Sequence, residues 1–299
     1  MKILLLGKNG QVGWELQRAL APLGELTALD FDTPDPWRAD FSQPDTLLAL
    51  LQKIQPELIV NAAAHTAVDK AESEPALARC INASAPGVLA RWAAEHGAWL
   101  AHYSTDYVFN GSGDAPRAED AITAPLNVYG QTKLEGEELI RASGCQHLIF
   151  RTSWVYAARG GNFARTMLRL AAERDVLNVI DDQVGAPTGA DWLADITAHA
   201  VCAAVNRPTL AGTYHAVAAG HTSWHGYASL VIDWARRHGQ AIRVPAHAIH
   251  AVATAAFPTA AQRPLNSRLD TGKLKQNFGL QAPPWQAGVE RMLAEVLGC

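Results

Sequence analysis

Tyr129 and Lys133 are the two residues whose types and spacing most directly suggest chemistry, in the segment Tyr-Gly-Gln-Thr-Lys. On a helix, four residues advance the chain by about 6 Å and return it to the same face, which brings the lysine ammonium beside the phenol. A phenol that exchanges protons at pH 7 needs roughly 4 kcal/mol of differential stabilisation of the phenolate, and a neighbouring cation supplies part of it. The same pair is also common on solvated helix faces, so the spacing alone does not establish catalysis.

The elements that must position this pair follow from the N-terminal half of the chain. Short apolar runs alternate there with amphipathic stretches, a pattern typical of right-handed βαβ units around a parallel sheet. We therefore predict an α/β fold, a doubly wound parallel sheet of Rossmann type, with the active cleft at the carboxyl ends of its strands. The expected strands are Lys2–Gly7, Glu25–Asp30, Glu57–Asn61, Trp99–Tyr103 and His147–Arg151, and the expected helices are Gln11–Ala21, Pro44–Ile54, Pro75–His96 and Asn127–Ala142.

After Arg151 the alternation weakens into longer loops. We expect residues 1–151 to form mainly a dinucleotide-binding domain and residues 152–299 mainly a smaller substrate-binding lobe, with some segments returning to the first domain. Residues 244–264 read as a loop that could act as a mobile closure. The helices expected in this half are Phe163–Arg174, Asp191–Asn206, Trp224–His238 and Trp285–Leu297.

Composition and charge restrict the class of protein. The chain has 299 residues, of which 48% are hydrophobic and 18% charged, an ordinary globular composition. A net charge of −4 offers no basic excess for a nucleic acid or an anionic membrane surface. No run approaches the roughly 18 apolar residues of a membrane span, and the four cysteines are scattered without close pairs. We expect a protein of the reducing cytoplasm.

A cofactor site is indicated where the first strand turns into the first helix. Gly7, Gly10 and Gly13 leave room for backbone amides to approach a pyrophosphate, although their spacing differs by one residue from the dinucleotide fingerprint. A tight strand-to-helix turn also uses glycines. Asp30 ends the second strand at about the offset from which an acid bonds the adenosine ribose, which favours NADH. Lys8, if it is not simply solvated, meets a 2′-phosphate instead, so NADPH stays open.

Two further segments are candidates for cofactor contact. Asp40 and Phe41 are placed to bracket the adenine, and Ala62, Ala63 and Ala64 present small side chains after the third strand, where a cofactor can pass closely. Packing in a helix or in the core accounts for the alanines equally well.

Ser104, Thr105, Asp106 and Tyr107 follow the fourth strand, so their polar groups converge with Tyr129 on the same strand-end cleft. At this point the chain resembles the extended short-chain dehydrogenase/reductase superfamily, and within it the dTDP-4-dehydrorhamnose reductases. The resemblance covers nearly the whole chain and is carried by the segments Gly7–Leu16, Asn61–Glu72, His102–Phe109, Pro125–Lys133, Arg151–Tyr156 and Arg263–Arg268.

The resemblance implies reduction of a dTDP-linked 4-keto sugar by nicotinamide hydride, the last step of dTDP-L-rhamnose synthesis. It gives Tyr129 the role of proton donor, has Lys133 lower the tyrosine pKa and hold the nicotinamide ribose, and has Thr105 bond the carbonyl. By the same resemblance, cofactor contacts fall on Gln11, Val12, Ala64, His65, Thr66 and Tyr103, and dTDP-sugar contacts on Asp106, Tyr107, Trp154 and Arg263. Core or rim packing is an alternative for Tyr107 and Trp154, and a surface salt bridge is one for Arg263.

Related nucleotide-sugar dehydratases carry Asp-Glu after this threonine, whereas here Tyr107 follows Asp106. Dehydration therefore lacks its base, and carbonyl reduction is the simpler assignment. Two alternatives remain open: a nucleotide-sugar 4-epimerase, which uses the same Tyr and Lys, and a noncatalytic dinucleotide-binding regulatory subunit.

No catalytic metal is expected, because His221 and His225 lack a nearby acid that would complete a zinc motif. The resemblance implies Mg²⁺ at an acidic homodimer interface in some family members. Glu15, Asp191 and Glu295 are the candidates here, and ordinary surface acids are the preferred interpretation. The amphipathic segment Trp285–Leu297 suits either packing on the lobe or a dimer contact.

Overall fold

The computed structural model describes residues 1–299, and at its centre six strands form one parallel sheet in the order β10-β5-β4-β3-β1-β2. The inner strands are almost wholly buried because helices cover both faces, which explains their continuous apolar runs. The predicted doubly wound α/β fold is confirmed. The strands are β1 (Lys2–Leu6), β2 (Glu25–Leu29), β3 (Leu58–Asn61), β4 (Trp99–Thr105), β5 (Gln146–Thr152) and β10 (Gly212–His215).

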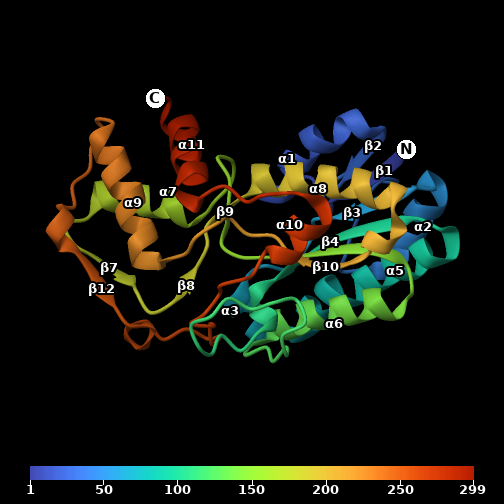
Figure 1. The fold of residues 1–299 in the computed structure, drawn as a ribbon, viewed down its shortest axis with the longest axis horizontal. Helices are drawn as coiled ribbons and strands as arrows, with labels where there is room; N and C mark the ends of the chain where they lie inside the picture. Colours follow the sequence, from blue (N-terminus) through green and yellow to red (C-terminus); the bar gives the residue numbers. More distant parts are fainter.

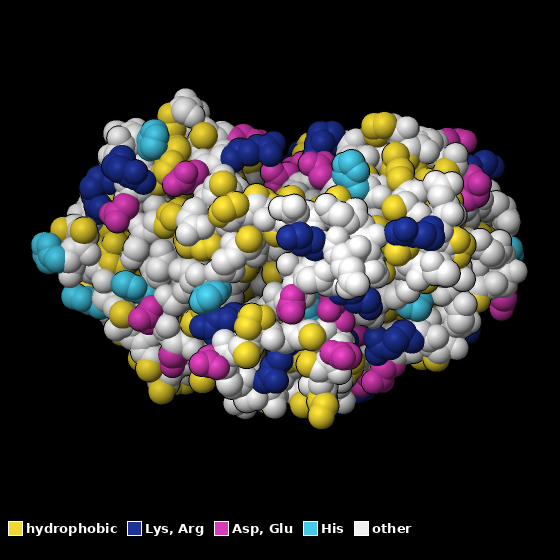
Figure 2. Space-filling model, in the orientation of Figure 1, with side chains coloured by type: hydrophobic (Ala, Val, Ile, Leu, Met, Phe, Trp, Pro, Cys, Tyr) yellow, Lys and Arg dark blue, Asp and Glu magenta, His cyan; other side chains and the backbone are white.

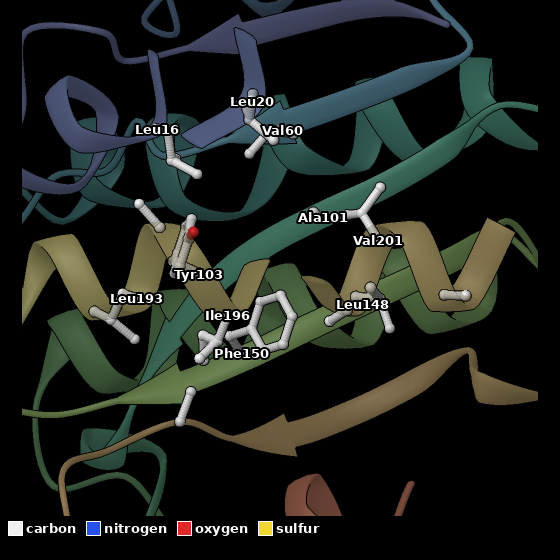
Figure 3. Close-up of a cluster of buried hydrophobic side chains, with 14 of the residues drawn as sticks. Leu16, Leu20, Val60, Ala101, Tyr103, Leu148, Phe150, Leu193, Ile196 and Val201 are labelled. Atoms are coloured by element: carbon white, nitrogen blue, oxygen red, sulfur yellow. The ribbon is translucent and has the colours of Figure 1, made fainter. Parts of the chain in front are cut away.

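The helices lie in two layers on either side of the sheet (Figure 1). On one face, α1 (Gln11–Leu20) and α8 (Ala190–Asn206) bury leucine and isoleucine side chains against alternate residues of the strands. Figure 3 shows Leu16 and Leu20 of α1 and Leu193, Ile196 and Val201 of α8 converging on this core. The opposite face is covered by α2 (Pro44–Ile54), α5 (Ala85–His96) and α6 (Val128–Ala142).

The five predicted strands are confirmed with ends that differ by at most two residues, but one predicted helix is wrong as a single element. The range 75–96 is divided into α4 (Pro75–Arg79), a π-helical turn (Cys80–Ser84) and α5. In that turn the amide of Ala85 bonds to the carbonyl of Cys80, five residues back. The wider turn turns Asn82 inward, where its side chain is fully buried. A further short helix, α3 (Val68–Ser73), precedes it.

Three elements from the C-terminal half join the sheet domain. Strand β10 pairs with β5, and α8 packs on α1 and the sheet. The sequence did not predict β10, because the short stretch Gly-Thr-Tyr-His lacks an apolar run. A short helix, α10 (Gly272–Phe278), packs beside it. These segments belong to the second half of the sequence but pack in the first domain.

A separate apolar core lies in the other end of the molecule (Figure 1). The strands β7 (Leu177–Ile180) and β12 (Ile249–Val252) pair in parallel there. The sequence predicted a loop at residues 244–264, and this is wrong for the part that forms β12. We retain the division near residue 151 as a proposal, with α8 and β10 assigned to the sheet domain. The elements of this second core are α7 (Phe163–Glu173), α9 (Trp224–Arg237), α11 (Trp285–Leu297), β7 (Leu177–Ile180) and β12 (Ile249–Val252).

Two short ribbons complete the fold. Strand β6 (Val155–Tyr156) pairs with β9 (Thr188–Gly189), and β8 (Val184–Gly185) pairs with β11 (Thr222–Ser223). No helix combines the length and apolar character that crossing a membrane requires. Positive and negative side chains are interspersed over the face shown in Figure 2.

Candidate active site

The start of α6 is held by two polar side chains, and this determines where Tyr129 lies. The Asn127 side-chain oxygen accepts a hydrogen bond from the amide of Gly130 (2.8 Å), and its amide nitrogen donates to the carbonyl of Gln262 (2.7 Å). The carboxylate of Glu72 accepts from the amide of Val128 (2.8 Å). With its first amides bonded in this way, the helix begins at a defined residue, and Tyr129 lies in its first turn.

The carboxyl end of β4 supplies the polar groups that face this tyrosine. The Thr105 hydroxyl donates to the carboxylate of Asp106 (3.1 Å) and accepts from the amide of Tyr107 (3.2 Å). The ring of Tyr107 packs edge-on against Tyr129, with 5.6 Å between the ring centroids. The structure therefore brings together Thr105, Asp106, Tyr107 and Tyr129, as the sequence predicted.

Burial governs the acidity of Tyr129. It raises the pKa of the phenol to about 12, a hydrogen bond with the Thr105 hydroxyl opposes the rise, and the nearby Asp106 carboxylate adds to it. The phenol therefore holds its proton at neutral pH, as a proton donor must. The pKa of Asp106 is itself raised to about 7 by burial, against hydrogen bonds from the hydroxyls of Ser267 and Thr105.

Lys133 is arranged differently from the expectation. Its Nζ donates to the carbonyl oxygen of Tyr103 (2.6 Å) and lies 3.2 Å from Nε2 of His102. Burial lowers the pKa of Lys133 to about 8, while the charge of Glu137 opposes this shift. Lys133 is not among the groups that shift the Tyr129 pKa, so the expected lowering of that pKa by the lysine is absent from this arrangement.

The three glycines of the turn after β1 are needed for different reasons: two are required by packing, and the third leaves room for a ligand. Gly7 has φ +85°, and a Cβ there would lie 2.6 Å from the amide nitrogen of Ala63, so packing alone demands glycine. A Cβ on Gly13 would collide with the Gly7 carbonyl. At Gly10 a Cβ would make only an ordinary contact of 3.5 Å. No side chain caps α1 at Gly10, so the amides of Gln11 and Val12 are free to bind an anion such as a pyrophosphate.

Around the end of β2, the carboxylate of Asp30 accepts hydrogen bonds from the amides of Asn9 (3.0 Å) and Phe31 (2.8 Å). Arg38 was not predicted from the sequence. Its exposed side chain donates through Nε to the carbonyl of Phe31 (2.9 Å). It therefore lies beside the position expected for the adenosine ribose. The signal in the sequence that could have indicated Arg38 is its position as a basic residue shortly after the second strand.

Asn82 is a second residue that sequence reasoning missed. Its side-chain oxygen accepts from the amide of His65 (2.8 Å), and its amide donates to the His65 carbonyl (3.1 Å) and the Thr132 hydroxyl (3.2 Å). It thereby ties the loop after β3 to α6. That loop contains Ala62, Ala63 and Ala64, half-buried and outside any helix, together with the exposed Thr66. The loop excludes the helical alternative for the alanines. Ala62 and Ala63 pack against the two cores of the sheet, so the core alternative is present, and the cofactor contacts stay predictions.

Two predicted cofactor contacts need correction. The Tyr103 side chain points into the core, where its hydroxyl bonds that of Thr197 (2.6 Å), so only its backbone faces the site. Phe41 is buried in the core of the opposite face and cannot bracket an adenine ring with its own. Asp40 accepts hydrogen bonds from Ser42 (2.9 Å and 2.6 Å) and stays a predicted contact.

An aromatic cavity adjoins the Tyr107 side of the site. It has a volume of about 270 Å³ and is lined by Tyr107 and Arg263 together with Phe163, Gln183 and Trp224 of the second core. The indole nitrogen of Trp224 donates to the Gln183 side-chain oxygen (3.1 Å). Aromatic walls with a few polar groups suit a flat, partly polar ligand.

Trp154, a predicted substrate contact, stacks on Trp224 with 3.6 Å between the ring centroids. Its φ of +50° lies in the left-handed region, which is unusual for a bulky side chain and is found at sites where function tolerates strain. The stack therefore contributes to the aromatic wall beside the cavity.

Arg263 forms a two-pronged ion pair with Asp69, at 3.1 Å and 2.6 Å. The salt bridge weighed in the sequence analysis is therefore present, yet the same guanidinium lines the aromatic cavity. A contact with a diphosphate remains a prediction.

Glu15, Asp191 and Glu295 border one cleft, and the negative charges of Asp191 and Glu295 join burial in raising the pKa of Glu15. Two of these acids form ion pairs: Glu15 is 3.8 Å from Arg18, and Asp191 is 3.1 Å from Arg291. No three His, Cys, Asp or Glu side chains form a group suited to a metal ion. His221 precedes α9, so it does not share a helix face with His225.

Comparison with known proteins shows the family to which the chain belongs. The family model described as RmlD substrate binding domain matches residues 1–297. The chain belongs to this family.

Relatives of known name match this chain over nearly their whole length. A dTDP-4-dehydrorhamnose reductase from Shigella flexneri is 60% identical over 99% of this chain and 98% of its own, and one from Escherichia coli K12 is 58% identical over the same shares. A solved dTDP-4-dehydrorhamnose reductase from Bacillus anthracis, in complex with NADP, is 34% identical with a TM-score of 0.87, covering 99% of this chain and 100% of its own.

Proposed function

We propose that this chain is an NAD(P)H-dependent reductase that converts dTDP-4-dehydro-β-L-rhamnose to dTDP-β-L-rhamnose, the last step of dTDP-L-rhamnose biosynthesis. The observation that carries the proposal is 60% identity, over 99% of the chain, to a relative named dTDP-4-dehydrorhamnose reductase. Three further relatives at 57–58% identity have the same name. The arrangement of Thr105 and Tyr129 at the end of β4 supports carbonyl reduction.

The residues of this chain supply the proton and the electrostatic environment, while a bound nicotinamide supplies the hydride. Tyr129, protonated at neutral pH, donates its proton to the oxygen formed from the C4 carbonyl. The Thr105 hydroxyl hydrogen-bonds that oxygen as its charge develops. To donate to the substrate oxygen, the Thr105 hydroxyl must turn its single proton away from Asp106, which accepts it at 3.1 Å in the structure. The roles of these three residues are part of the proposal.

The donor groups around the glycine turn fit a dinucleotide. The uncapped end of α1 offers amides to a pyrophosphate at Gly10, where a side chain is not excluded by packing. Asp30 and Arg38 lie at the end of β2 for the adenosine ribose and its 2′-phosphate. Lys133 would hold the nicotinamide ribose only by exchanging one of its present buried partners, the Tyr103 carbonyl or His102. The solved Bacillus anthracis relative is in complex with NADP, which supports binding of a dinucleotide of this kind.

The nucleotide part of the substrate fits the aromatic cavity. Tyr107 and Arg263 line it on the side of the reactive phenol, and Trp154 extends the wall by stacking on Trp224. A thymine ring is flat and partly polar, so it suits these walls. We assign Asp106 to the sugar and Arg263 to the diphosphate, for which the arginine must exchange part of its ion pair with Asp69.

A homodimer remains a proposal that the acidic cleft supports only indirectly. Glu15, Asp191 and Glu295 share a cleft between α1, α8 and α11, where the charges of Asp191 and Glu295 raise the pKa of Glu15. Since these acids do not form a metal site within one chain, Mg²⁺ would need acids from a second copy across an interface. Sedimentation equilibrium with Mg²⁺ and with EDTA tests both parts. A monomer under both conditions contradicts the dimer.

The activity is tested with purified protein, dTDP-4-dehydrorhamnose, and NADPH or NADH in separate reactions. We expect loss of reduced-cofactor absorbance in proportion to the dTDP-rhamnose formed. Cofactor binding without any turnover would contradict the proposal and favour the regulatory subunit. Interconversion of the sugar at C4 without net cofactor oxidation would favour the 4-epimerase.

A further inference from the structure

Three polar side chains form a buried row beneath the site, one from each of three neighbouring elements. Asn61 ends β3, His102 lies in β4, and Lys133 lies in α6; their exposed fractions are 1%, 0% and 2%. The Asn61 amide nitrogen lies 3.0 Å from Nδ1 of His102, and Nε2 of the same ring lies 3.2 Å from Nζ of Lys133. The histidine therefore bridges an amide and an amine, with no access for water.

The donors and acceptors in this row can be assigned from the heavy atoms. The amide of Ala63 donates to the side-chain oxygen of Asn61 (3.0 Å), so it is the Asn61 nitrogen, a donor, that faces His102. Nδ1 of His102 must then accept. Burial lowers the pKa of this histidine well below its usual value, so the ring is neutral and carries its single proton on Nε2.

That assignment conflicts with a charged lysine. An ammonium group offers only donors, so it cannot accept from Nε2–H at 3.2 Å. A neutral amine at Lys133 can accept from His102 while still donating to the Tyr103 carbonyl (2.6 Å). A protonated Lys133 requires the ring proton on Nδ1, and then the Asn61 amide must turn its oxygen toward the ring and give up the bond from Ala63.

We propose that His102 is a positioning residue whose tautomer follows the charge of Lys133 and, through Asn61, determines whether the backbone amide of Ala63 is held. Its significance for catalysis rests on the proposed reductase function, since Ala63 belongs to the loop assigned to the cofactor. That loop also contacts the glycine turn, because Ala63 lies against Gly7. The charge on the lysine is therefore coupled to the backbone that receives the cofactor.

The charged groups around Lys133 keep both of its states accessible. From α6, the carboxylate of Glu137 favours the ammonium, but Arg151 of β5 (2.7 Å) and Arg141 of α6 (3.0 Å) bind the same carboxylate and weaken its effect. Burial favours the neutral amine, and the resulting pKa of Lys133 is about 8.

The direct test is the ¹⁵N spectrum of histidine-labelled protein without substrate, because the shifts of the two ring nitrogens report the tautomer. Loss of a signal in the His102→Gln variant assigns the ring. We expect the His102 proton to move from Nδ1 to Nε2 as the pH rises from about 6 to about 10, with a midpoint near the Lys133 pKa. A matched Lys133→Met variant should keep one tautomer throughout.

A single tautomer across this range in the unmodified protein would overturn the proposal, as would a switch that persists in Lys133→Met. The ¹⁵N titration does not depend on turnover. The tautomer proposal can therefore be wrong while the reductase assay succeeds, and it can hold while the reductase assay fails.

A second readout compares two variants of the ring. The side-chain oxygen of His102→Gln reaches the place of Nε2 and can only accept from Lys133, which favours the ammonium over the neutral amine, whereas His102→Asn reaches only Asn61. We expect the alkaline limb of the kcat/KM profile to move up by about one pH unit in His102→Gln. We expect no such shift in His102→Asn. Equal losses without any shift would indicate a merely structural histidine, and if neither variant folds, the ¹⁵N titration decides.

Discussion

The Nζ atom of Lys133 lies 2.6 Å from the carbonyl oxygen of Tyr103 on strand β4, although Tyr129 lies one turn away on its own helix. The lysine is thus anchored to the sheet, and the acidity of Tyr129 is governed by burial and by the groups at the end of β4. A phenol with a pKa of about 12 is fully protonated at neutral pH, which suits the reductive direction.

Tyr129→Phe removes the proposed proton donor and leaves the ring packing against Tyr107 in place. We expect kcat to fall by about 10²–10⁴-fold, the usual contribution of a general acid. The affinity for NADPH, measured by calorimetry, should change little because the cofactor groups are untouched. Undiminished turnover would contradict the role of Tyr129.

Thr105→Val deletes the hydroxyl that faces both the phenol and the substrate oxygen. We expect kcat to fall by about 10²-fold or more, the range seen when one donor to a developing oxyanion is lost. Thr105→Ser is the matched control, because it keeps the hydroxyl and should retain most of the activity. Similar losses in both variants would indicate that the methyl group, and therefore packing, matters instead.

Asp106→Asn should stabilise the protein at alkaline pH while impairing catalysis. Burial raises the pKa of Asp106 from 3.8 to about 7, so between these values the unfolded chain releases a proton that the folded protein keeps. Stability therefore falls as pH rises through this window and levels off above about 7.

The uncharged asparagine avoids that loss, so at pH 8 we expect its free energy of unfolding to exceed that of the unmodified protein by up to about 4 kcal/mol. Near pH 4 the two should be similar, as measured by urea denaturation. The exposed Asp114→Asn is the control and should show no such pH-dependent gain. A pH-independent difference for Asp106→Asn would argue against the raised pKa.

Arg38→Ala tests recognition of the adenosine 2′-phosphate. The Arg38 guanidinium lies beside the end of β2 through its bond to the Phe31 carbonyl. We expect the KM for NADPH to rise about tenfold, as for loss of a charge-assisted contact, while the KM for NADH changes little. Lys8→Ala is the comparison, and a larger effect there would transfer the role to the glycine turn. Equal changes for both cofactors would exclude either residue as the phosphate contact.

The sequence by itself determined five of the six strands of the sheet and the edge at which their polar residues meet. Apolar runs and amphipathic stretches are patterns among neighbouring residues. The positions of the first five strands along the chain, the glycine turn and the helix that carries Tyr129 were therefore predictable from the sequence. The polar residues Thr105 and Asp106 directly follow a strand, and strand ends in a parallel sheet meet at one edge.

Only the tertiary structure decided which groups these residues contact. Strand β10 joins the sheet through pairing with β5, and Arg263 turns to Asp69, a residue far away in the sequence. The π turn that buries Asn82 and the row from Asn61 to Lys133 likewise depend on packing between elements. A lysine side chain is long and flexible, so its spacing from a tyrosine gives proximity, whereas the partner it bonds is chosen by the buried acceptors that surround it.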